Sequence, residues 1–211
     1  MTEKEWLEER KKGIGGSDAS AIMGQSPWKT NVDLWMEKTG RKEAEDISEK
    51  PCVVYGKTME PLLREMFRVN NPQYEVKHEE NTIIRHSKYP FLFASLDGIL
   101  IDKETGEIGI LEIKTTNIHK PETYAKEWKD GIKPAYYCQV LHYMNVIGAE
   151  FAKVYVNFKY SEDFQKIRTY TITRQDPGVE EDIKLLEEKE IQFWNEYVLK
   201  DKRPPAKLPE I

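Results

Sequence analysis

Three charged side chains lie on two neighbouring apolar runs of the sequence, and two of them are carboxylates that could hold a cation between them. Asp97 falls within the run Leu92–Ile101, while Glu112 and Lys114 fall at the end of the run that begins at Ile108. Two β-branched runs separated by a short polar loop containing glycine predict a β-hairpin. Two carboxylates can hold a cation between them, and an ammonium can offset negative charge that develops nearby.

The register of this hairpin determines whether the three side chains meet. If residues 103–106 form the loop, Ile101 pairs with Ile108, and the same register places Asp97 directly opposite Glu112. Directly opposed residues have Cβ atoms ~5 Å apart. Successive side chains alternate between the two faces of a sheet, so the lysine two positions after Glu112 shares the face of both carboxylates.

The same residues also allow a purely structural interpretation. Glu112 and Lys114 can form an ion pair at the end of a sheet, and Asp97 can cap a turn before Gly98. Against this, two carboxylates on a strand that is apolar on both sides repel each other unless a metal or a lysine compensates them. From the residues alone, both interpretations stay open.

Length and composition set the broad class of the protein. At 211 residues and 24.8 kDa, with 39% apolar and 33% charged residues, the chain suits one globular domain spanning 1–211. No apolar run approaches the ~20 residues of a membrane span, and the charged N-terminus lacks a signal peptide, so we expect a cytoplasmic protein without a membrane partner. Cys52 and Cys138 lack metal-ligand spacing, so we expect two buried thiols. The net charge of −5 does not favour DNA binding by overall charge, so any DNA path must be a local basic lining.

A glycine-rich corner near the N-terminus is a second candidate site. Glycines at 13, 15 and 16 break a predicted helix over 2–12, and Ser17 is expected to be the N-cap of a short helix over 18–23. Backbone N–H groups at such a helix start can bind an anion. An ordinary corner between two helices is the alternative.

The remaining elements place several conspicuous polar residues. Helices are expected over 31–38, 51–70, 134–147 and from 177 to about 199, and strands over 74–78, 82–85, 151–159 and 166–173. The helix over 51–70 is expected to bury Val54, Met59, Leu62, Leu63, Met66 and Phe67, with Glu60 interrupting this face. The helix over 134–147 is apolar nearly all round and therefore buried.

Polar residues in and around the buried helix stand out. Gln139 and His142 are its polar exceptions, and Gln139 shares one face with Tyr143. A basic and aromatic stretch over 128–136 leads into it, and residues 25–28 read as a turn. His78 and His86 lie in polar surroundings and are expected to face solvent. The polar face of the last helix, 180–182 and 187–190, is expected to be solvated.

The chain resembles a known superfamily. The segments S-L-D-G and L-E-I-K match the signature of the PD-(D/E)XK nucleases, except that Leu96 stands where the superfamily name has proline. Within that superfamily the chain is similar to the phage lambda-type exonucleases and YqaJ-like viral recombinases, through R-K-K-G-I-G-G-S-D-A-S, G-K-T-M-E-P and Q-V-L-H-Y-M. The resemblance implies an α/β (α+β) fold with a restriction-endonuclease-like core, a central mixed sheet flanked by helices.

The resemblance also implies roles for individual residues. The catalytic set would be Asp97, Glu112, Lys114, Gln139 and Glu60. One or two Mg²⁺ ions, or Mn²⁺, would be held by Asp97, Glu112, the Ile113 carbonyl and Glu60. The 5′-phosphate of a DNA end would be bound by Arg10, Ser17 and Ser95.

The implied activity is 5′→3′ digestion of one strand of linear double-stranded DNA, leaving 3′ overhangs for recombination by single-strand annealing. Implied partners are DNA ends, an annealing recombinase, and two further copies of the chain in a ring-shaped trimer, in a bacterial cell with a phage or prophage origin. A ring can combine an acidic exterior with a basic lumen. The alternatives are a catalytically idle DNA-end-binding module, or a RecB/Cas4-like nuclease of different polarity. Nucleases of the Cas4 kind usually carry an iron–sulfur cluster, and two cysteines cannot supply its four ligands.

Overall fold

A computed structural model describes residues 1–118, 120–159 and 165–207. The helices are α1 (Glu3–Lys11), α2 (Gly16–Met23), α3 (Asn31–Lys38), α4 (Pro51–Asn70), α5 (Pro121–Glu127), α6 (Pro134–Ile147), α7 (Val179–Gln192) and the π-helix η1 (Phe193–Val198). The strands are β1 (Ile14–Gly15), β2 (Tyr74–Lys77), β3 (Ile84–Arg85), β4 (Leu92–Ala94), β5 (Gly98–Asp102), β6 (Ile108–Asn117), β7 (Phe151–Lys159) and β8 (Gln165–Thr173).

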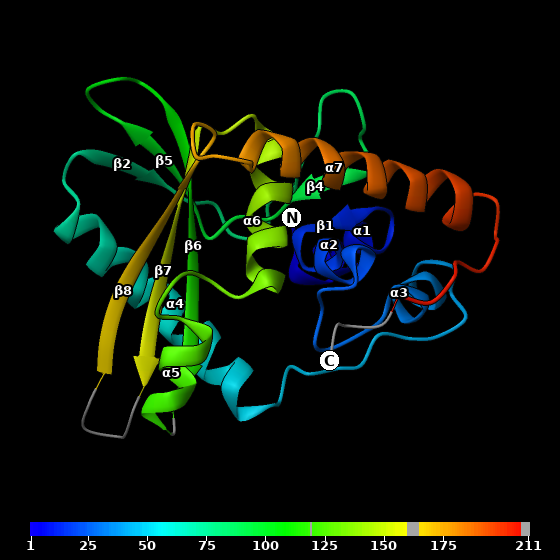
Figure 1. Cartoon of the computed structure of the whole chain (residues 1–211), viewed down its shortest axis with the longest axis horizontal. Helices are drawn as coiled ribbons and strands as arrows, with labels where there is room; N and C mark the ends of the chain where they lie inside the picture. Colours follow the sequence, from blue (N-terminus) through cyan, green and yellow to red (C-terminus); the bar gives the residue numbers. More distant parts are fainter. Residues whose placement is uncertain (119, 160–164, 208–211) are drawn as a thin grey trace.

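A mixed five-stranded sheet forms the centre of the fold. Its strand order is β2-β5-β6-β7-β8, in which β6 and β7 are parallel and the other neighbours are antiparallel. A parallel pair needs a crossover connection, and α5 and α6 lie in the one that joins β6 to β7. α4 packs against one face of the sheet, while α6 lies between the sheet and α2 (Figure 1). The expected mixed sheet flanked by helices is confirmed.

The central strand β6 is buried on both faces, as its continuous apolar sequence predicts. Leu111 and Ile113 point into a core shared with Leu63 and Phe67 of α4. Ile110 points the other way, into the larger core that includes α2, α6 and α7. The expected division of the apolar side chains between two faces is confirmed.

The hairpin register is confirmed, but the first apolar run is not one strand. Ile101 pairs with Ile108, and the ladder ends at the pair Gly98–Leu111. β4 instead belongs to a three-stranded sheet, β1-β4-β3, where it runs parallel to β1. The chain leaves one sheet and enters the other at residues 95–97, so Asp97 sits at the bend and not inside the ladder.

Two predicted helix starts are wrong. α2 begins at Gly16 with Gly15 as its N-cap, where we expected Ser17, and the Asp18 carboxylate in the first turn accepts the Gly15 N–H at 3.2 Å. α7 begins at Val179 after Gly178, and not at Pro177. Gly178 has φ +86°, a left-handed conformation that glycine adopts without a steric cost.

The buried face of α4 also differs from the prediction. Leu63, Arg64 and Phe67 are buried and Met59 packs beside them, whereas Val54, Leu62 and Met66 are exposed. Helical spacing alone is compatible with the burial of either of two neighbouring apolar stripes of the helix. At the N-terminal end of the same helix Cys52 is exposed, so only the expected burial of Cys138 is confirmed.

Three further expectations on polar residues need correction. We expected Thr115 to Asn117 to lie in a loop after the hairpin, but they continue β6 and pair with β7. His78 and His86 are half-buried and not solvent-facing. Glu190 is completely buried, and its carboxylate contacts His142 at 2.7 Å, which explains how that histidine is accommodated inside the core.

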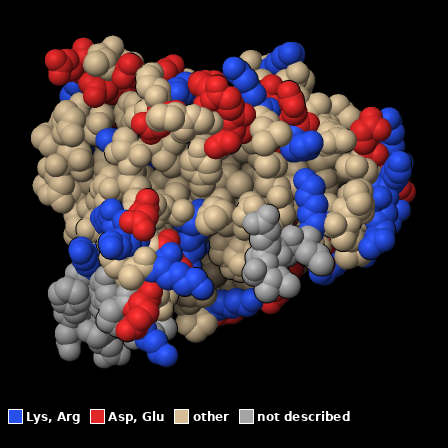
Figure 2. Space-filling model, in the orientation of Figure 1, with Lys and Arg blue, Asp and Glu red and all other residues tan. Residues whose placement is uncertain are grey.

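Charge is distributed unevenly over the surface. In Figure 2 acidic side chains are most numerous along the upper edge, over α7 and the β5–β6 loop. Basic side chains are most numerous along the right edge, and at the lower left they are interspersed with acidic ones. A net charge of −5 therefore coexists with locally basic surface. Among the described residues, no helix combines the length and apolar character that crossing a membrane requires.

Candidate active site

The three charged residues of the hairpin converge where β5 and β6 meet. The Glu112 carboxylate lies 2.6 Å from the Lys114 ammonium, both on one face of β6. Asp97 reaches the same place from the bend before β5, where its Oδ2 accepts the backbone N–H of Ile113 at 2.7 Å. This side-chain contact replaces the next ladder bond, so the sheet itself fixes the Asp97 carboxylate.

Glu112 is the most deeply buried of these groups, with 2% exposure. Its Oε1 accepts hydrogen bonds from Lys114 and from the Gln139 amide at 2.8 Å, while its buried Oε2 has no hydrogen-bond partner among the described residues. Burial and repulsion by Asp97 raise the pKa of Glu112 to about 8. A buried carboxylate oxygen without a partner is costly, so Glu112 Oε2 is a donor atom suited to hold a cation.

Gln139 joins the strand to the helix that covers it. Its Oε1 accepts the Lys114 ammonium at 3.1 Å, while its Nε2 donates to Glu112 and, at 3.2 Å, to the Tyr143 hydroxyl. Burial alone would lower the pKa of Lys114, but Glu112 and Asp97 outweigh burial and raise it. The expected position of Gln139 beside the charged cluster, on one face with Tyr143, is confirmed.

Glu60 approaches the cluster from α4 through an arginine. Glu60 is ion-paired with Arg64, one turn later on the helix, and Arg64 Nε donates to the backbone carbonyl of Asp97 at 2.7 Å. Burial and the charge of Asp97 raise the pKa of Glu60 to about 7. Sequence reasoning missed Arg64, although an i,i+4 partner of Glu60 on a helix was a detectable signal.

The donor atoms of this cluster fit a hard divalent cation. Asp97 and Glu112 offer carboxylate oxygens, the unpartnered Glu112 Oε2 among them, and such oxygens are what Mg²⁺ prefers. Glu60 is engaged by Arg64, and within the described ranges no three His, Cys, Asp or Glu side chains are grouped closely enough to form a metal centre on their own. The pair Asp97 and Glu112 is therefore the core of the candidate metal site.

The residues expected at a DNA 5′ end lie close to this cluster. The Arg10 guanidinium stacks on Trp6 at 4.4 Å, and the Trp6 indole donates to Ser95 Oγ at 3.2 Å, two residues before Asp97. Ser17 is exposed at the start of α2. The sequence analysis did not single out Trp6 as a link between Arg10 and Ser95, because 89 residues separate the indole from the serine.

Gly16 brings the glycine-rich corner against α6. A Cβ atom at this position would lie 2.5 Å from the Tyr143 ring and 3.0 Å from Gln139 Cγ. Only glycine allows the start of α2 to approach the side chains that contact Glu112 so closely. The two candidate sites of the sequence are therefore adjacent parts of one site.

His78 and His86 lie in different surroundings. Burial and the charge of Arg64 lower the pKa of His78, which places it near the arginine of the cluster. His86 instead accepts the backbone N–H groups of Lys88 and Tyr89 at Nδ1, at 3.2 and 3.0 Å, a structural role.

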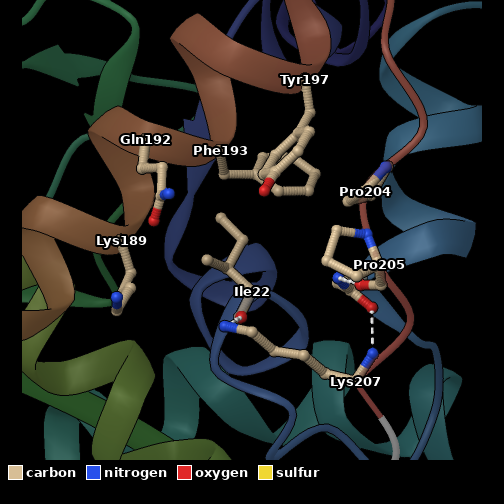
Figure 3. A pocket seen from close by; sticks show the side chains of 9 residues that line it. Ile22, Lys189, Gln192, Phe193, Tyr197, Pro204, Pro205 and Lys207 are labelled. Atoms are coloured by element: carbon tan, nitrogen blue, oxygen red, sulfur yellow. Dashed lines mark hydrogen bonds between the residues drawn. The ribbon is translucent and has the colours of Figure 1, made fainter.

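A separate cavity of about 90 Å³ opens at the C-terminal end of α2 (Figure 3). Lys207 from the C-terminal segment spans it and donates to the carbonyl of Ile22 at 2.7 Å. Its walls come from α2, α3, α7, η1 and the C-terminal segment: Ile22, Asn31, Lys189, Gln192, Phe193, Tyr197, Pro204, Pro205 and Lys207. None of these is a predicted site residue, so this cavity is not part of the candidate site.

The chain is similar to known proteins both in sequence and in fold. Residues 5–150 match the model of the YqaJ-like viral recombinase domain. The uncharacterised protein YqaJ of Bacillus subtilis (strain 168) is 37% identical over 205 residues, which are 97% of this chain and 59% of that protein. The chain thus spans about three-fifths of the length of this relative.

Solved structures of two exonucleases share the fold. The alkaline exonuclease LHK-Exo from Laribacter hongkongensis is 19% identical, with a TM-score of 0.62 over 94% of this chain and 97% of that one. A phage-related exonuclease from Haemophilus somnus 129PT is 14% identical, with a TM-score of 0.56 over 90% and 96% of the two chains. The family match covers most of the chain, both exonuclease structures share its fold, and the chain belongs to the YqaJ-like viral recombinase domain family.

Proposed function

We propose that this protein is a metal-dependent deoxyribonuclease that digests linear double-stranded DNA from its 5′ ends. The observation that carries the proposal is the joining of Glu112, Lys114 and Gln139 in one hydrogen-bonded group beside Asp97. A structural ion pair alone does not explain the buried, unpartnered oxygen of Glu112. The shared fold with two exonucleases, one of them also solved in complex with dAMP, supports the same activity.

Each residue of the cluster has a defined task in this proposal. Asp97 and Glu112, with the Ile113 carbonyl and Glu60, would hold Mg²⁺ or Mn²⁺. When bound, such a cation polarises a phosphate and lowers the pKa of a water molecule. Lys114 orients the attacking water and offsets the negative charge that develops on the phosphate.

One neutral and one cationic side chain, Gln139 and Arg64, keep this arrangement in place. Gln139 contacts Glu112 and Lys114 with opposite ends of its amide, so it fixes both side chains in one geometry. Arg64 holds the backbone of Asp97 and the carboxylate of Glu60, and so ties α4 to the strand bend. Both act as positioning residues.

A time course on linear duplex DNA, with and without Mg²⁺, tests the activity. We expect nucleotide release only with the cation, and its loss in Glu112→Gln and Lys114→Ala. Glu107→Gln is a matched control, because Glu107 is an exposed carboxylate on the same hairpin. Retained cleavage in Glu112→Gln would contradict the role assigned to Glu112. A wild type that binds DNA ends but does not cleave them would favour the idle binding module.

The direction of digestion would be set by a 5′-phosphate site formed by Arg10, Ser17 and Ser95. A guanidinium contact to a 5′-phosphate contributes ~1.5–3 kcal/mol, equivalent to about ten- to a hundredfold in rate if it forms at the transition state. Initial rates on matched 5′-phosphoryl and 5′-hydroxyl duplexes should therefore differ in wild type, and Arg10→Ala should reduce the difference. Equal rates on both duplexes in wild type would refute a 5′-phosphate site.

The 3′ overhang, the annealing recombinase partner and the trimeric ring complete the proposal. Uneven surface charge at a net charge of −5 supports a DNA path along a local basic surface. Mass measurement in solution with and without DNA tests the assembly, and a 24.8 kDa monomer under both conditions contradicts the ring.

A further inference from the structure

An exposed indole lies close to the candidate active site without an assigned task. Trp28, between α2 and α3, is 66% exposed, although a buried tryptophan would contribute far more hydrophobic stabilisation. Its ring packs on Tyr136 with the centroids 6.0 Å apart, and the Lys114 ammonium lies 4.8 Å from the Tyr136 centroid. The centroid of the indole therefore lies no farther from the Lys114 ammonium than the sum of these two distances. This span corresponds to roughly three nucleotide steps at ~3.4 Å each.

The segment that carries Trp28 is anchored, so the exposed ring has a defined position. The buried Ser26 hydroxyl accepts the backbone N–H groups of Trp28 and Lys29, at 3.2 and 3.3 Å. The Lys29 ammonium is in turn paired with Asp18 and Glu37, at 3.4 and 2.8 Å. The backbone of Trp28 is held in place while its ring is exposed. This combination favours a ring that contacts a binding partner over a side chain that is mobile on the surface.

The surroundings combine aromatic rings with ammonium groups. The buried Trp128 ring packs on the same Tyr136 ring, with the two centroids 5.8 Å apart. The Lys133 ammonium lies 5.5 Å from the Trp128 centroid and also pairs with Glu127. With Lys114 over Tyr136, the three rings carry two cations beside them. Rings on which bases stack, next to cations that attract phosphates, are the usual composition of a surface for single-stranded nucleic acid.

We propose that Trp28 stacks on a nucleobase of the DNA within a few nucleotides of the cleaved bond, with Tyr136 supporting the indole from behind. This inference rests on the proposed nuclease function and adds a positioning contact to it. The task of Trp28 is to hold the strand end in register with Asp97, Glu112 and Lys114. It binds any base, because every base presents a π face.

Variants at one position separate stacking from other roles. Base–aromatic stacking lost on alanine substitution weakens binding by about 5- to 150-fold. We therefore expect Trp28→Ala and Trp28→Leu to raise KM for duplex DNA within this range, and Trp28→Phe to retain most of the affinity, since it keeps a π face. Leu199→Ala, which truncates an apolar side chain of 65% exposure, should leave KM unchanged.

A fluorescent base reports the contact directly. 2-Aminopurine placed at the first, second or third nucleotide from the 5′ end should be quenched by wild-type protein at one of these positions, and not by Trp28→Ala. Equal KM for Trp28→Leu and wild type would overturn stacking, and so would a change of molecular mass in Trp28→Ala, which would assign the ring to a contact between protein copies. If wild type neither binds nor digests DNA, the proposed function fails. If wild type digests DNA and Trp28→Ala is indistinguishable from it, only this inference fails.

Discussion

Asp18 anchors the N-terminal helices near the candidate site, and its removal should destabilise the protein in a pH-dependent way. Its carboxylate is buried in α2 and lies 2.8 Å from Lys38 and 3.4 Å from Lys29, and it accepts the Gly15 N–H. Burial alone would raise the pKa of Asp18, but the two lysines outweigh burial and lower it to about 2.

The size of the effect follows from this pKa. A decrease from 3.8 to about 2, at ~1.36 kcal/mol per pKa unit, corresponds to roughly 2 kcal/mol of stability at neutral pH. Asp18→Asn also leaves the Lys38 ammonium, whose side chain is only 9% exposed, without its carboxylate. Breaking a buried pair costs ~3–5 kcal/mol, so we expect a loss of about 2–4 kcal/mol.

The sign with pH is fixed by the lowered pKa. The contribution of Asp18 is fully present above its unfolded pKa near 3.8, and it is lost as the pH falls towards 2. Urea unfolding of wild type and Asp18→Asn at fixed protein concentration should therefore show a constant gap from pH 5 to 7 that narrows below pH 4. Asp46→Asn, an exposed carboxylate, is the control and should change stability by less than ~0.5 kcal/mol.

A stability difference between wild type and Asp18→Asn below about 1 kcal/mol at pH 7 would refute the reasoning, and so would a difference that does not narrow in acid. The double variant Asp18→Asn with Lys38→Met adds a second check. It should be more stable than Asp18→Asn alone, since the unpaired ammonium is then removed.

Two further predictions test the packing around the site. Gly16→Ala should lower the free energy of unfolding by ~1–3 kcal/mol and lower the turnover, because the added Cβ pushes Tyr143 and Gln139 away. Urea unfolding and initial rates measure the two effects. Gly131→Ala is the control, because a Cβ atom at position 131 meets nothing within 4 Å. In the buried pair of His142 and Glu190, burial lowers the pKa of His142 but Glu190 outweighs it and raises the pKa above its ordinary value. This stabilisation is present below pH ~6.5 and lost as the pH rises through the folded pKa, so the thermal midpoint of wild type should fall between pH 6 and 9 more than that of His142→Gln. Parallel pH profiles for the two proteins would contradict the pairing.

Local patterns in the sequence were enough to predict much of the candidate site. The register of the hairpin and the shared face of Glu112 and Lys114 follow from the alternation of side chains along a strand and from a loop of four residues, both of which are local properties. Asp97 instead reaches this group from the bend before β5. The bounds of α3, α4 and α6 were also predictable, since Thr30 caps α3 and a proline opens each of the other two.

Contacts between distant segments were decided by the tertiary structure. Which stripe of α4 is buried depends on the sheet that it meets, so Leu62 is exposed although its spacing fits the core. The link from Arg10 through Trp6 to Ser95, and the arginine that joins Glu60 to Asp97, connect segments tens of residues apart. No periodicity encodes such pairs, because they form only when two elements are placed side by side.

The sequence by itself therefore determined the register of the hairpin and the shared face of Glu112 and Lys114. Only the tertiary structure brought Gln139 onto both Glu112 and Lys114 and left the Trp28 ring exposed beside Tyr136. The physical reason is range. Strand alternation and helix caps act over a few residues, whereas burial, ion pairing and ring stacking depend on which surfaces the folded chain places in contact.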